Sequence, residues 1–153
     1  MTVIVDTGVL YADHDTDVAR HEVASDAIDS VYDGAHGTPY VSDCIYDEVV
    51  TLPLVRGGSL APAKRLGERV RGVDPYPPVY GMFHVSPAVF EQAVDVFERY
   101  DDQGLSGTDA TTVARCAYHD VDAVTSFDTD FDGVVGRIDP EGGVNRLGRM
   151  ESV

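Results

Sequence analysis

Residues 105–132 read LSGTDATTVARCAYHDVDAVTSFDTDFD, and no other stretch says as much about the fold. Apolar side chains recur with helical spacing over 108–119, which predicts an amphipathic helix. The run DAVTSF (122–127) predicts a buried strand, and Asp128 follows it directly. A helix that leads into an apolar strand is typical of an α/β sheet, in which helices connect neighbouring strands.

The alternation of strands and helices continues through the rest of the chain. The β-branched run TVIV (2–5) predicts another buried strand, which ends at Asp6. Further strands are expected at 39–41, 82–85 and 135–138, and further helices over 15–32, after Ser42, over 59–72 and from Pro87. We therefore predict an α/β fold, a three-layer αβα sandwich around a central, mostly parallel sheet of four to five strands.

The length of 153 residues suits one domain over 1–153. Its core is expected at about 2–139. The tail, 140–153, lacks a periodic apolar pattern and is expected to be irregular.

The chain is strongly acidic, with 27 Asp and Glu against 11 Lys and Arg and a formal net charge of −16. The mutual repulsion of these acids is screened at about 1 M salt, where the Debye length is about 3 Å. The composition resembles that of proteins from salt-loving archaea or bacteria, so most acids are expected on the surface. The overall field opposes nucleic-acid binding, which would then depend on metal or on a basic cluster. One such cluster consists of Arg56, Lys64, Arg65, Arg69 and Arg71.

Nothing in the sequence suggests export or a membrane. The N-terminus has no basic segment ahead of an apolar run, so no signal peptide is expected. No apolar run reaches about 18 residues, the length that a membrane-spanning helix requires. We therefore expect a cytoplasmic protein without a membrane partner.

Four carboxylates follow predicted strands or lie near the start of the next helix, and we call them the acidic quartet: Asp6, Glu48, Asp109 and Asp128. In an open parallel sheet these positions share one edge, so acids far apart in sequence can meet there. Clustered carboxylates repel unless a cation lies among them. Oxygen ligands favour a hard cation, Mg²⁺ or Mn²⁺, and the five histidines include no H-x-x-x-H pair. The quartet is therefore predicted to bind metal and to be catalytic.

Three members of the quartet also have a structural explanation. Asp6 could cap a helix, and Asp109 fits a capping box with Ser106. Glu48 lies beside an apolar stripe, where a glutamate commonly keeps its carboxylate in water.

The segment DTDFDG (128–133) also matches the opening of a calcium-binding EF-hand loop. An EF-hand requires a helix on each side of the loop. The preceding run predicts a strand, and Pro140 with the glycines after it cannot begin a good helix. A calcium site therefore stays the less favoured interpretation.

Three segments together resemble a PIN domain: VIVDTGVLYA (3–12), the spacing from Ser42 to Glu48, and 105–132. The last is the most specific, because an Asp opens a helix and [ST]-x-D-x-D-F follows about twenty residues later. The resemblance covers roughly 3–135. It implies a PIN-like sandwich and a metal-dependent ribonuclease, and compact single-domain members are mostly VapC-like toxins of toxin–antitoxin pairs.

The resemblance assigns a role to each matching residue. The quartet would hold Mg²⁺ or Mn²⁺ and hydrolyse RNA phosphodiester bonds with a metal-activated water. Thr7 and Ser126 match hydroxyls near the metal, and Asp130 matches the second acid of the closing motif.

The resemblance also implies partners: an RNA substrate (tRNA, rRNA or mRNA), a VapB-like antitoxin and a second copy of the chain. Arg65 and Arg69, on the predicted helix over 59–72, are expected to contact RNA or the antitoxin. Two alternatives stay open: a PIN nuclease of RNA processing that is not a toxin, and a PIN fold that only binds other proteins.

Overall fold

The sheet is built around β1 (Thr2–Val5), which pairs in parallel with β2 on one side and β4 on the other. The computed structural model describes residues 1–145, and its six strands follow the order β3-β2-β1-β4-β5-β6. The first five strands are parallel, and β6 pairs antiparallel with β5. The remaining strands are β2 (Thr38–Ser42), β3 (Gly81–Phe83), β4 (Ala123–Thr125), β5 (Arg137–Asp139) and β6 (Gly143–Asn145).

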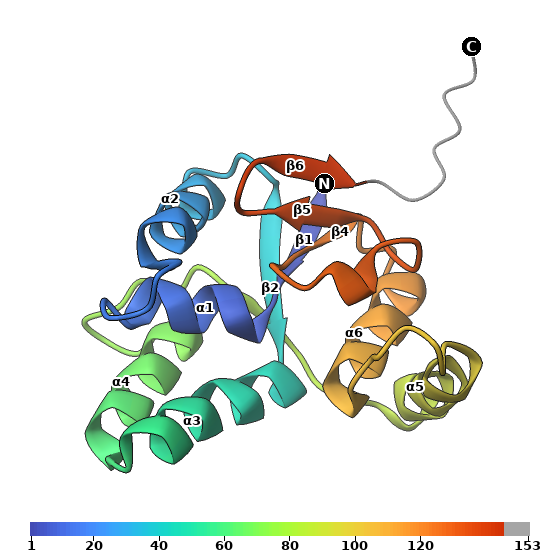
Figure 1. Ribbon diagram of the computed structural model, residues 1–153, viewed down its shortest axis with the longest axis horizontal. Coiled ribbons are helices and arrows are strands. Elements are labelled where there is room, and N and C mark those ends of the chain that lie inside the picture. The colour runs from blue at the N-terminus through green and yellow to red at the C-terminus, as the bar shows by residue number, and fades with distance from the viewer. Residues whose placement is uncertain (146–153) are drawn as a thin grey trace.

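Helices lie on both sides of the sheet, with α1, α2 and α4 on one side and α5 and α6 on the other (Figure 1). Their bounds are α1 (Thr7–His14), α2 (His21–Tyr32), α3 (Asp43–Gly57), α4 (Leu60–Arg71), α5 (Pro87–Arg99) and α6 (Gly107–Tyr118), with a short 3₁₀ helix, η1 (Thr129–Phe131). Within the described residues, no helix combines the length and apolarity that crossing a bilayer requires. The predicted three-layer α/β class is confirmed.

Two predictions of local structure were wrong. The expected helix over 15–32 begins only at His21, as α2, and residues 15–20 form turns after α1, which ends at His14. The Asp15 carboxylate accepts the Tyr11 hydroxyl at 2.8 Å and the Asp17 N–H at 3.0 Å. These contacts satisfy polar groups in a turn rather than in a continuing helix. In the tail expected to be irregular, β6 adds a strand at 143–145, while 146–153 lie outside the described residues.

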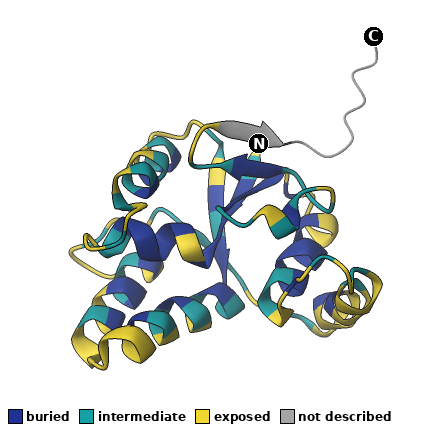
Figure 2. Ribbon diagram, viewed as in Figure 1, coloured by how far each residue is buried: buried dark blue, intermediate teal, exposed yellow. Residues whose placement is uncertain are grey.

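The central strands are almost completely buried, and the outward faces of the helices are exposed (Figure 2). Val3, Ile4 and Val5 of β1 have no exposed surface, which explains why this strand is a continuous apolar run rather than an alternating one. Phe131 of η1 is also fully buried in the main core. It fixes the segment that directly follows Asp128.

We predict that Phe131→Ala destabilises the protein by about 3–5 kcal/mol, because the truncation leaves a cavity in a dense core. Urea unfolding at constant molar KCl measures the change. Phe97→Ala is the matched control, since Phe97 on α5 is 52% exposed. Equal losses in the two variants would contradict the assignment of Phe131 to the core.

Candidate active site

The order of the strands determines where the site forms. From β1 the chain proceeds to β2 and β3 on one side of the sheet, and it later returns to β4 on the other side. In doubly wound sheets, ligands bind at the carboxyl ends of the strands where this direction changes. The corresponding crevice lies between the carboxyl ends of β1 and β4, where Asp6 and Ser126 follow their strands.

Asp6 is held at this edge by contacts to the neighbouring strand. Its backbone N–H donates to the Thr125 carbonyl at 3.0 Å, and the Ser126 hydroxyl donates to its Oδ2 at 2.6 Å. Asp6 is also the N-cap residue of α1, although its side chain makes no capping hydrogen bond. Its carboxylate therefore contacts the residue that follows the neighbouring strand rather than the N–H groups of the helix.

Glu48 reaches the site from the second turn of α3. Ser42 caps this helix by accepting the Ile45 N–H at 3.1 Å, so strand β2 passes directly into α3. The Thr7 hydroxyl donates to Glu48 Oε1 at 3.0 Å. This bond ties the beginning of α1 to α3 and orients the glutamate.

Asp109 lies in the first turn of α6, where the predicted capping box with Ser106 is confirmed. Ser106 N–H donates to Asp109 Oδ2 at 2.9 Å, and Asp109 N–H donates to Ser106 Oγ at 3.1 Å. Only one carboxylate oxygen takes part in the cap. The structural and functional interpretations of Asp109 are thus compatible.

Asp128 is the N-cap of η1, and its Oδ1 accepts the Asp130 N–H at 2.8 Å. Its own N–H donates to Ser126 Oγ at 3.0 Å. Strand β4 precedes this segment and no helix of the EF-hand kind follows it within the described residues. The flanks of an EF-hand are therefore missing, as the sequence predicted.

All four acids of the quartet line one open cavity of about 700 Å³. Thr7 and Ser126 line it as well, whereas Asp130, Arg65 and Arg69 are not among its lining residues. Within residues 1–145 no three His, Cys, Asp or Glu side chains are gathered closely enough to form a ready metal cluster. The structure thus brings the quartet into one cavity, and metal binding by it stays a prediction.

The acids affect one another electrostatically. Burial raises the pKa of Asp6 to about 6, the Ser126 hydrogen bond opposes this, and the charges of Asp109 and Glu48 add to the rise. Burial also raises the pKa of Asp109, with further contributions from Asp128 and Glu48. A hard divalent cation would relieve the mutual repulsion of these acids, and it prefers oxygen ligands such as theirs. The residues present therefore fit Mg²⁺ or Mn²⁺.

Arg69 is better explained by structure than by substrate binding. Its guanidinium lies 2.8 Å from Asp13 Oδ2, and Asp13 also accepts the Ser25 hydroxyl. The Asp13 side chain is only 8% exposed, so Arg69 neutralises a nearly buried carboxylate between α1 and α4. Arg65 is exposed on α4, away from the cavity lining, and contact with RNA or an antitoxin stays a prediction for it.

Two arginines line the cavity: Arg20, which sequence reasoning missed, and Arg56, which it named only as a member of the basic cluster. Arg20 is the N-cap residue of α2, and Arg56 lies in the last turn of α3. A signal was present for Arg20, because no other Lys or Arg occurs among the first 55 residues. It was overlooked because the basic cluster from Arg56 to Arg71 was the more conspicuous feature.

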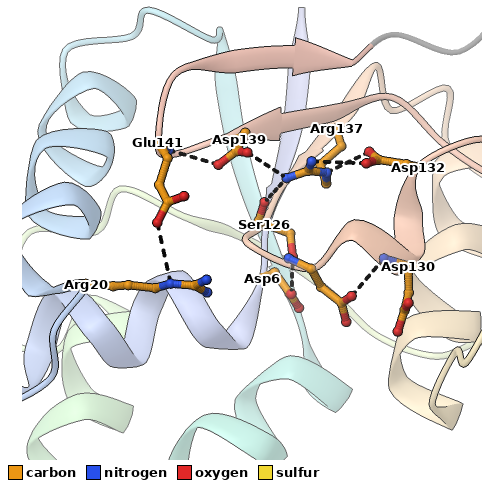
Figure 3. Close-up of polar contacts among 9 residues, drawn as sticks. Asp6, Arg20, Ser126, Asp130, Asp132, Arg137, Asp139 and Glu141 are labelled. Carbon is orange, nitrogen blue, oxygen red and sulfur yellow. Dashed lines mark hydrogen bonds and ion pairs between the residues drawn. The ribbon is translucent and has the colours of Figure 1, made fainter.

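Sequence reasoning also missed Arg137 of β5, which contacts both sides of the β4–η1 segment through Ser126 and Asp132 (Figure 3). Its Nε and Nη2 donate to both carboxylate oxygens of Asp132, at 2.7 and 3.1 Å. Nη1 donates to the Ser126 carbonyl at 3.0 Å and lies 3.3 Å from Asp139. Arg137 therefore fixes the backbone of the serine whose hydroxyl contacts Asp6.

Comparisons with known proteins gave one family match. The PIN domain family model matches residues 3–136. A search of curated proteins gave no match.

The chain is also similar to three solved structures. Crystalline VapC20 from Mycobacterium tuberculosis, described as a toxin that cleaves the sarcin–ricin loop, has a TM-score of 0.70 and 24% identity, over 84% of this chain and 92% of that one. A toxin–antitoxin complex from Klebsiella pneumoniae has a TM-score of 0.64 and 18% identity, over 90% and 97%. FitAcB from Neisseria gonorrhoeae has a TM-score of 0.57 and 19% identity, over 91% and 98%. At these identities the likeness shows a shared fold.

We predict that Asp6→Asn stabilises the metal-free protein at pH 7. The pKa of Asp6 rises from 3.8 to about 6 on folding. The contribution of this group to the free energy of unfolding is therefore complete below the unfolded pKa and is lost as pH rises through about 6. The amide removes this titration and retains an oxygen for Ser126. The expected gain is up to about 3 kcal/mol at pH 7 and shrinks towards pH 4.

Thermal unfolding in EDTA at fixed KCl, from pH 4 to pH 8, measures this gain. Asp47→Asn is the control, because Asp47 is an exposed acid of α3 outside the cavity lining. A variant at Asp6 that is less stable than wild type at pH 7 would show that burial and the neighbouring acids do not destabilise the ionised carboxylate.

We predict that Arg137→Met lowers the free energy of unfolding by about 2–3 kcal/mol. The Arg137 side chain is 7% exposed, and the substitution removes its ion pairs with the partly buried carboxylates of Asp132 and Asp139. Arg99→Met, at an exposed arginine of α5, should stay within about 0.5 kcal/mol of wild type. Indistinguishable urea midpoints for the two variants would exclude the bracing role.

Proposed function

This chain belongs to the PIN domain family, and on that premise we propose that it is a Mg²⁺- or Mn²⁺-dependent endoribonuclease, the toxin of a VapBC-type pair. The observation that carries the proposal is the meeting of the quartet in one cavity at the switch point of the sheet. A site of decayed function would have no need to retain four mutually repelling carboxylates in one place.

Asp6, Glu48, Asp109 and Asp128 would hold the cation or cations. When bound, Mg²⁺ or Mn²⁺ supplies Lewis acidity and activates water for phosphodiester hydrolysis. The chain's own hydroxyls orient the acids: Ser126 donates to Asp6, and Thr7 donates to Glu48. These bonds reduce the freedom of the carboxylates before any ligand arrives.

The proposal extends to macromolecular partners. One similar structure is a toxin–antitoxin complex, and another is a toxin that cleaves the sarcin–ricin loop, so we include an antitoxin and structured RNA. An apolar face is available for a protein partner or a second copy, because Phe90, Val94 and Phe97 of α5 are 57%, 37% and 52% exposed. Apolar patches of this kind are common at protein interfaces.

We predict that the purified protein cleaves RNA with Mn²⁺ or Mg²⁺ at molar KCl and that EDTA abolishes the cleavage. Transfer RNA and a sarcin–ricin hairpin are suitable substrates, and the products should carry 5′-phosphate and 3′-hydroxyl ends. Asp6→Asn and Glu48→Gln should each lower kcat at least about a hundredfold, because metal catalysis supplies several kcal/mol.

Asp47→Asn is the matched control, since it removes one carboxylate from the neighbouring position of α3. Undiminished cleavage in EDTA would rule out the metal mechanism. Equal activity of Glu48→Gln and Asp47→Asn would exclude Glu48 from the site. Absence of both cleavage and Mn²⁺ uptake in the wild type would indicate a PIN fold that only binds other proteins.

A further inference from the structure

Two arginines share the cavity with the acidic quartet. Among the described residues that line it, Arg20 and Arg56 are the only ones with a permanent positive charge. The other members of the basic cluster, Lys64, Arg65, Arg69 and Arg71, do not line it. In a chain with a net charge of −16, two guanidinium groups beside four carboxylates are a local exception to the overall field.

An aromatic ring lies beneath each of these guanidinium groups. Arg20 Cζ lies 4.5 Å from the centre of the Phe127 ring, and Arg56 Cζ lies 5.1 Å from the centre of the Tyr11 ring. Both rings line the same cavity. A cation–π contact orients the guanidinium plane but leaves its charge and most of its N–H groups available.

Each aromatic residue is itself close to the quartet. Phe127 lies in the chain between Ser126 and Asp128, so the Arg20 guanidinium is placed beside the β4–η1 turn. In Figure 3 the Arg20 side chain runs along α1, below Glu141, towards the region of Asp6. Arg20 is therefore at the edge of the catalytic cavity rather than on a remote surface.

Arg56 reaches the cavity along the same helical face as Glu48. Glu48, Leu52 and Arg56 are spaced four residues apart on α3, and all three line the cavity. Eight residues of helix rise about 12 Å, so the backbone of Arg56 lies well away from that of Glu48. This distance suits a phosphate that flanks the one undergoing hydrolysis.

Arg20 forms only a weak ion pair with its carboxylate partner. Its Nε lies 3.6 Å from Glu141 Oε1, and the two side chains are 55% and 54% exposed. An exposed pair at this distance contributes little stability and is screened by salt. By contrast, Arg137 has its carboxylate at 2.7 Å and is 7% exposed, so it cannot exchange partners at low cost.

We propose that Arg20 and Arg56 are substrate-positioning residues that bind RNA phosphates on either side of the scissile bond, with Arg20 exchanging Glu141 for a phosphate. This inference rests on the proposed function. The guanidinium fork donates two parallel hydrogen bonds to a phosphate, a geometry that a lysine does not reproduce. Such contacts bring a polyanion to an acidic protein without reading its sequence.

The test compares Arg20→Met and Arg56→Met with Arg99→Met, an exposed arginine of α5 that does not line the cavity. The substrate is an RNA that the wild type cleaves with Mn²⁺. We expect KM to rise about five- to twentyfold for each cavity variant, with a smaller change in kcat. The slope of log KM against log[KCl] should decrease by about one for each, and Arg99→Met should behave as wild type.

The Glu141→Gln variant tests the exchange independently, through the direction in which KM changes. If Arg20 exchanges Glu141 for a phosphate, removing the carboxylate should lower KM about two- to fivefold at low salt, and the gain should vanish at molar KCl. The gain should also vanish in the double variant with Arg20→Met. Arg20→Lys and Arg56→Lys should restore the wild-type salt slope, but their KM should return only part of the way from that of the methionine variants to that of the wild type.

The outcomes separate this inference from the proposed function. If the wild type cleaves RNA but both methionine variants keep its KM and salt slope, the positioning role is excluded and the nuclease assignment stands. A wild type that neither cleaves nor binds RNA in Mn²⁺ overturns both. Arg20 and Arg56 are exposed, so unchanged melting temperatures are expected and establish that the variants fold.

Discussion

The parallel pairing of β1 with β4 is the constraint on which the rest of the structure depends. Val5 pairs with Thr125, so the residues that follow, Asp6 and Ser126, leave the sheet side by side. The 2.6 Å hydrogen bond between them is the closest link between two segments 120 residues apart in the chain. Val3, Ile4 and Val5 of β1 are fully buried, so a shift of this register would disrupt the packing of the core and separate Asp6 from Ser126.

The second general feature is the use of helix beginnings to hold negative charge. Asp6 is the N-cap of α1, Asp109 lies in the first turn of α6, and Asp128 is the N-cap of η1. Backbone N–H groups donate to the carboxylates of Asp109 and Asp128, whereas the Asp6 side chain makes no capping hydrogen bond. Glu48 lies inside a helix and depends on the Thr7 hydroxyl instead. The same topology that brings the acids together thus reduces part of the cost of their repulsion.

Several arginines of this acidic chain fall into two groups with different chemistry. Arg69 and Arg137 are held by carboxylates at 2.8 and 2.7 Å and join elements of the fold. Arg115 shares features of both groups, since it is fully buried on α6, lies 3.7 Å from Asp43 and has its Cζ 5.3 Å from the centre of the Phe83 ring. Arg20 and Arg56 instead lie over aromatic rings at the cavity. Within the part of the chain that the structure describes, only this second group faces the quartet.

The sequence by itself determined the class of fold and the identity of the acids. The periodicity of strands and helices is local, so TVIV, DAVTSF and the helix of 108–119 could be predicted from composition and spacing. The acids could be predicted to meet because strand-end acids in a parallel sheet share one edge. Only the tertiary structure decided which cations face those acids. Arg65, Arg69, Arg20 and Arg137 look alike in sequence, because the function of an arginine depends on the nearest carboxylate or ring in space. Those partners, Asp13, Phe127 and Asp132, lie on other elements or across a turn, and chain position alone does not identify them.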